Sequence, residues 1–183
     1  MGGATIILGI GADKLSETFR SLCGKPLPLT SRERLAIDLF NTSVLESSSA
    51  TRLLTLVMAI ESLLDLQLRS PAAAGLIESF LATVSTTDLI PSTEKDSLAG
   101  SLQYRRFESI SAAGRALVSM RPGERCYLEL PAPRFFTECY EARSRLVHGR
   151  NPPEYKELGR LAATLEVFVS DLLTQPYFAD GAT

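Results

Sequence analysis

The segment from Ser47 to Leu64 constrains the fold most strongly, because its apolar residues cover much of a helical circumference. It begins in a cluster of serines that can cap a helix, and it must end before Pro71. Its apolar positions are Leu53, Leu54, Leu56, Val57, Ile60, Leu63 and Leu64. A helix of this composition needs cover on most of its sides, so it predicts a central helix rather than one on the surface.

Prolines and turn residues divide the rest of the chain into further helical stretches. We expect helices after the cap-like residues 30–33, from Ala72 to about Ser85, from Glu94 to Met120 with an interruption near Gly114, from about Pro133 to His148, and from Pro152-Pro153 onward. Residues 126–130 alternate like a short strand or extended link. The sequence therefore predicts an all-α, up-and-down bundle of five to seven helices over residues 31–176. Residues 1–30 form an extension of uncertain structure, and residues 177–183 form a tail.

The charge of the chain is unevenly distributed. The formal net charge of -2 argues against a protein that coats nucleic acid by bulk electrostatics. Residues 103–160, however, carry ten Arg and one Lys against seven Glu. The planar fork of arginine suits phosphate oxygens, so this segment could meet phosphate locally. The alternative is that these arginines reflect codon usage and are solvated on helix surfaces.

The cysteines and the start of the chain exclude several classes of protein. Cys23, Cys126 and Cys139 are far apart and form no C-x-x-C pair, which predicts neither a zinc site nor a disulfide framework and indicates a reduced, cytoplasmic setting. The apolar residues 4–10 are too few to span a bilayer and lack the basic flank of a signal peptide. Gly9 and Gly11 are not followed by the third glycine of a nucleotide loop. We expect no membrane partner, no metal and no cofactor.

His148 is the only histidine, which restricts imidazole chemistry to one residue per chain. Arg143 precedes it by five residues, a rise of about 7.5 Å and a rotation of about 140° along a helix. The two groups do not share a helix face, but a long arginine and a histidine on a final, fraying turn could line one groove. An imidazole can move protons while a guanidinium holds phosphate, which suffices for metal-free RNA transesterification. The alternative is a histidine that only complements the helix dipole.

Glu61 offers a partner for Arg143. At helical spacing it shares a stripe with Val57, Leu64 and Leu68, where a carboxylate needs a partner or a wet cavity. Arg143 shares its own stripe with the apolar positions Phe136, Tyr140 and Val147, so it too is expected to point partly inward. We hypothesise that Glu61 hydrogen-bonds Arg143 and orients it. The alternative is an exposed Glu61 on a helix face turned away.

The run Cys139–Gly149 resembles the R-x4-6-H motif of the HEPN superfamily, including the polar residue after the arginine. Its Y-x-x-R-S-x-x-V-H-G form is similar to the ApeA-like branch. Residues 60–64 also resemble the E-S-L-L type of second helix found there. The resemblance covers approximately residues 31–174, and the two motifs are about eighty residues apart in the expected order.

This resemblance implies a homodimer whose two motifs meet at a cleft between subunits. In active members that cleft is the active site of a metal-independent endoribonuclease, which leaves a 2′,3′-cyclic phosphate on its product. Such proteins act in bacterial defence, abortive infection or toxin–antitoxin systems. If the roles of the HEPN motif residues are carried over to this sequence, Arg143 contacts phosphate and His148 is the acid–base group. Ser144, Tyr140 and Glu61 support them, and Arg145 and Arg150 bind RNA.

The partners implied are RNA, a second copy of the chain, and a protein or nucleotidyltransferase antitoxin. The same superfamily includes members that do not cleave RNA. A non-catalytic helical module for dimerisation, or for binding nucleotide, RNA or protein, is therefore the alternative.

Overall fold

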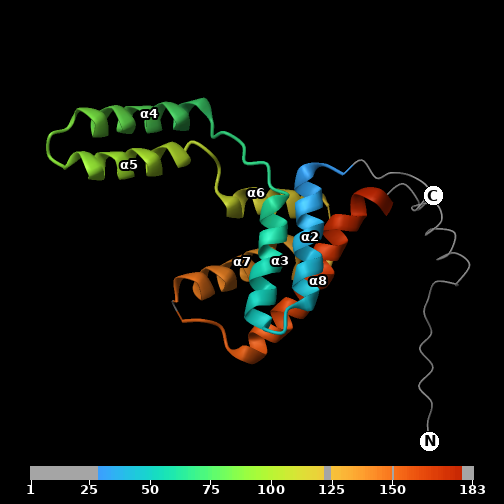
Figure 1. Cartoon of the computed structure of the whole chain (residues 1–183). Helices are drawn as coiled ribbons and strands as arrows, with labels where there is room; N and C mark the ends of the chain where they lie inside the picture. Colours follow the sequence, from blue (N-terminus) through green and yellow to red (C-terminus); the bar gives the residue numbers. More distant parts are fainter. Residues whose placement is uncertain (1–28, 122–124, 150, 179–183) are drawn as a thin grey trace, which may run out of the picture. The chain divides into compact units, whose positions relative to one another are not determined.

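The computed structural model describes residues 29–121, 125–149 and 151–178, and within these ranges the chain is an all-α helical bundle (Figure 1). Its helices are α2 (Ser31–Leu45), α3 (Ser49–Ser62), α4 (Pro71–Thr86), α5 (Ser92–Tyr104), α6 (Ile110–Met120), α7 (Ala132–His148) and α8 (Tyr155–Phe178). Two short strands, β1 (Cys126–Tyr127) and β2 (Leu130–Pro131), stand between α6 and α7. The expected N-terminal extension lies almost entirely outside the described residues.

The central helix predicted from its apolar circumference is α3. Leu53, Leu56 and Ile60 have no exposed surface, and α3 packs against both α8 and α7. Ser48 caps its start, where the serine hydroxyl accepts a hydrogen bond from the backbone N–H of Thr51. The burial on several sides explains why its sequence lacks a clean polar face.

A short hairpin precedes α7, where the sequence alternates. β1 and β2 pair antiparallel, and Leu128 and Glu129 between them have φ values of 50° and 65°. Two consecutive left-handed residues give the turn a twist that matches the strands. The hydroxyl of Tyr127 donates to Asp171 of α8 at 2.7 Å, and the Tyr127 ring stacks against Phe135. The hairpin is thereby fixed to the start of α7 and to α8.

The helix expected from Glu94 to Met120 is two helices, and its interruption is not at Gly114. The chain leaves helical geometry after Arg105, and Ser109 then caps the start of α6. Gly114 lies inside α6, where an added Cβ would overlap the ring of Phe136 from α7. The glycine therefore permits close helix packing instead of ending a helix.

Between α5 and α6 the chain runs antiparallel to the segment that precedes α4, and we call residues 67–69 and 106–108 the neck. The N–H of Arg69 donates to the carbonyl of Arg106, and the N–H of Glu108 donates to the carbonyl of Gln67, both at 2.9 Å. Beyond the neck, α4 packs on α5 as a helical hairpin (Figure 1).

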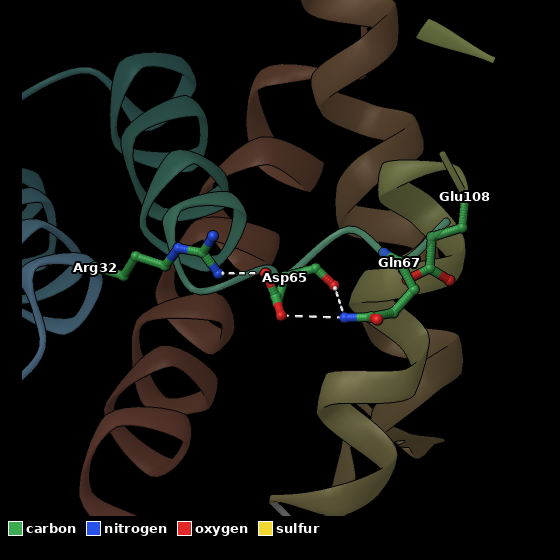
Figure 2. Close-up of polar contacts among 4 residues, drawn as sticks. All are labelled: Arg32, Asp65, Gln67 and Glu108. Atoms are coloured by element: carbon green, nitrogen blue, oxygen red, sulfur yellow. Dashed lines mark hydrogen bonds and ion pairs between the residues drawn. The ribbon is translucent and has the colours of Figure 1, made fainter. Parts of the chain in front are cut away.

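Polar side chains connect the neck to α2. Figure 2 shows Arg32 of α2 directed at the carboxylate of Asp65, at 2.8 Å, with the Gln67 side chain turned back to Asp65. The carboxylate of Glu108 accepts a hydrogen bond from the Gln67 backbone at 3.1 Å. These contacts hold the segment after α3 in the position from which it enters the neck.

The last helix, α8, begins at Tyr155, so the expectation that Pro152-Pro153 starts it is wrong by a few residues. A proline disfavours helical geometry in the residue before it, which keeps the chain extended ahead of Pro153. Pro153 itself is buried. Within the described residues, no helix combines the length and the apolar character needed to cross a membrane.

Candidate functional site

The residues singled out by the sequence belong mainly to α7, whose inner face is firmly packed. Phe136, Cys139 and Ala142 have no exposed surface. The helix ends at His148, as expected, and Gly149 follows with φ 62°. The N–H of Gly149 donates to the carbonyl of Arg145, so α7 ends in a left-handed cap directly after His148.

Arg143 lies between Glu61 and Tyr140. Its Nη2 is 3.7 Å from Oε2 of Glu61, and its guanidinium carbon is 5.9 Å from the centre of the Tyr140 ring. At 3.7 Å the contact with Glu61 is an ion pair and not the expected hydrogen bond. The side chains are only 27% and 20% exposed, so Glu61 is not turned to solvent.

The carboxylate of Glu61 is poorly solvated. Its Oε1 is buried and accepts no hydrogen bond from the described residues. Burial raises the pKa of Glu61, and the nearby Arg143 opposes that rise. The predicted stripe on α3 is shorter than expected, because α3 ends at Ser62 and the 66% exposed Leu68 belongs to the neck.

Tyr140 lies beside the ion pair, on the same helix as Arg143. Its ring centre is 5.9 Å from that of Phe136, and the side chain is half-buried. Burial raises the pKa of Tyr140, and the carboxylate of Glu61 raises it further. The phenol therefore stays protonated near neutral pH and can donate a hydrogen bond.

His148 is exposed, and none of the described residues forms a hydrogen bond or ion pair with its imidazole. Because α7 is a regular helix from Ala132 to His148, the side chains of Arg143 and His148 are about 140° apart around its axis and do not share a helix face. Ser144 is half-buried beside Arg143. Arg145 forms an ion pair with Glu157 of α8 at 3.8 Å. Arg150 lies outside the described residues.

The described residues offer no group of three His, Cys, Asp or Glu side chains that could hold a metal ion. Cys126 is exposed, Cys139 is buried, and both are free thiols. Burial raises the pKa of Cys139, so this thiol is a poor nucleophile and serves packing. Cys23 lies outside the described residues.

Sequence reasoning missed a pocket of about 200 Å³ beside Tyr140. Its lining comes from the neck, the end of α5, the start of α6 and α7, and includes Arg69, Tyr104, Arg105, Phe107, Ser109 and Tyr140. The expected helix over residues 94–120, interrupted only near Gly114, hid this pocket, because it gave no reason for residues 106–108 to pair with residues 67–69 and bring Arg69 beside Tyr104. The serine at position 109, a good helix cap, was the available signal.

Neither a protein-family model, nor a curated protein, nor a solved structure matches this chain. A functional assignment therefore depends on the side chains of α3 and α7 and on their surroundings.

Proposed function

We propose that this chain is a HEPN-like endoribonuclease that cleaves RNA without a metal, by transesterification in a cleft between two copies. One observation carries the proposal: the only histidine is exposed at the capped end of α7, five residues after an arginine that forms an ion pair with a partly buried carboxylate. An accessible imidazole can exchange protons, and a positioned guanidinium can neutralise phosphate.

The reaction needs two proton transfers and charge neutralisation. The imidazole of one copy takes the proton of a ribose 2′-hydroxyl, and that oxygen forms a bond to the adjacent phosphorus. The bond from phosphorus to the 5′-oxygen breaks, and the imidazolium of the second copy protonates the leaving oxygen. Arg143 stabilises the charge on the phosphate oxygens. The products are a 2′,3′-cyclic phosphate and a 5′-hydroxyl.

The geometry of α7 supports a dimeric cleft. Each chain has one histidine, and Arg143 and His148 point in directions about 140° apart on a regular helix. Two α7 ends brought together would supply both the base and the acid. The proposal places the activity in the cytoplasm, in bacterial defence or toxin–antitoxin function, with a protein or nucleotidyltransferase antitoxin as the restraining partner.

Matched arginine variants test the site within one helix. We expect Arg143→Ala to abolish cleavage of a mixed RNA pool, because the phosphate loses its guanidinium. Arg134→Ala is the control, since Arg134 is exposed on the same helix. Equal loss of cleavage in both variants would mean that general positive charge on α7, and not the Arg143 position, binds the RNA.

The second candidate is a non-catalytic binding module that uses the same surface. The ion pair between Arg143 and Glu61 favours it, because a guanidinium already neutralised by a carboxylate has less charge to offer phosphate. This candidate predicts RNA or nucleotide binding by the wild type and by His148→Ala alike, with no cleavage by either. Expression of the wild type would then slow cell growth no more than expression of His148→Ala does.

A further inference from the structure

We infer that the pocket beside Tyr140 holds one base of the RNA strand whose phosphate meets Arg143. The inference rests on the proposed RNA-cleaving function and assigns its substrate subsite. It starts from a hollow that the described helices and the neck form together, next to the residues of the candidate site.

The pocket has the size and the rings of a base-binding site. Tyr104 is the last residue of α5, Phe107 belongs to the neck, and Tyr140 comes from α7. Its volume of about 200 Å³ is below the range typical for drug-sized ligands, roughly 300–1,000 Å³, so it suits a single planar group. Aromatic side chains beside a basic groove bind single-stranded nucleic acid by stacking on its bases.

The charges around the pocket favour an anionic ligand. Arg69 and Arg105 line it and are exposed. The Nε of Arg69 donates to the carbonyl of Arg105 at 2.8 Å, which fixes the Arg69 guanidinium while its Nη groups have no ion pair among the described residues. Glu108 also lines the pocket, but its carboxylate already accepts a hydrogen bond from the Gln67 backbone. The phosphates flanking a bound base would meet these two arginines.

Tyr140 lies between the pocket and Arg143, the residue proposed to hold the phosphate. It lines the pocket, and the guanidinium of Arg143 lies over its ring at 5.9 Å. Along α7 the rise from Tyr140 to Arg143 is about 4.5 Å, so a base in the pocket carries its phosphate within reach of Arg143. Tyr104 and Arg105 also line a neighbouring hollow of about 560 Å³ along α5, which gives the strand a path away from the pocket.

Binding of a short single-stranded RNA tests the inference, in a His148→Ala background that keeps the RNA intact. Fluorescence anisotropy measures the RNA affinity of the His148→Ala protein and of three double variants, which carry Tyr104→Ala, Tyr104→Phe or, as a control, Tyr155→Ala in addition. Tyr104 and Tyr155 are both exposed tyrosines, but only Tyr104 lines the pocket. We expect Tyr104→Ala to weaken binding roughly 5- to 150-fold through lost stacking. Tyr104→Phe and Tyr155→Ala should bind as tightly as the background protein.

Two further ligands separate the outcomes. An abasic strand of equal length and charge should bind as weakly to the background protein as intact RNA binds to Tyr104→Ala. Equal binding of intact and abasic strands, or full binding by Tyr104→Ala, would overturn the inference. A nucleoside monophosphate that binds through Tyr104 when RNA does not would assign the pocket to a free nucleotide instead. If RNA binding depends on Tyr104 but the wild type cleaves no RNA, the base-binding role of the pocket would be supported and the proposed nuclease activity would be refuted.

Discussion

At the scale of the residue, the ionisation of Glu61 couples the candidate site to stability. Burial raises its pKa in the folded chain above the ordinary value of 4.5. A raised folded pKa means that the contribution of this group to stability is complete below the ordinary pKa and is lost as pH rises through the raised value. The Arg143 guanidinium beside Glu61 favours the ionised form and opposes that rise.

Replacing Glu61 by Gln should therefore remove this part of the pH dependence. We expect the free energy of unfolding of the wild type to fall relative to Glu61→Gln as pH rises through the window above 4.5, because only the wild type must bury a charge. Urea unfolding at a series of pH values measures the difference. A difference that is constant with pH would show that the Arg143 contact balances the desolvation of Glu61, and one that grows in favour of the wild type would show that the contact outweighs it; either result would contradict the expectation.

At the scale of the element, the contact between α6 and α7 depends on Gly114. A Cβ at this position would overlap the ring of Phe136, which has no exposed surface and stands next to Tyr140. The ring cannot turn freely in a packed core, so a methyl group there forces the helices apart. This contact positions the part of α7 that leads to the candidate site.

We expect Gly114→Ala to destabilise the fold by about 1–3 kcal/mol through overpacking. Gly100→Ala is the matched control, because Gly100 lies inside α5 with nothing within 4 Å of an added Cβ. That control should stabilise the chain by about 0.4–1 kcal/mol through reduced freedom of the unfolded state. Chemical denaturation of both variants gives the comparison. Stabilisation by both substitutions would contradict the close packing of α6 on α7.

The elements that the sequence predicted well are those with strong local signals. The apolar circumference of α3 correctly indicated a central helix, and the predicted end of α7 at His148 is confirmed. Gly114 misled, because local propensity cannot reveal a ring from another helix. The pairing of the neck segments also depends on contacts between distant residues, so the pocket at Tyr104 was not predictable from helical periodicity. The approach of Glu61 to Arg143 was predictable, but its distance was not.

At the scale of the whole molecule, the proposed chemistry requires two copies of the chain. We expect cleavage per mole of protein to fall on dilution below the dimer dissociation constant, because a monomer carries one imidazole. Sedimentation over the same concentrations should show the dimer dissociating where activity falls. Activity per mole that stays constant while the protein is monomeric would refute the cleft between copies.

Metal-independent RNA cleavage by His148 is tested most directly by incubating a mixed RNA pool in EDTA with the wild type and with His148→Ala, followed by analysis of the product ends. Circular dichroism checks that the variant keeps its helices, as expected for an exposed side chain. We expect products with 2′,3′-cyclic phosphate ends from the wild type and none from the variant, because no other histidine can replace His148. Cleavage by His148→Ala at the wild-type rate, or no cleavage by the wild type, would contradict this expectation.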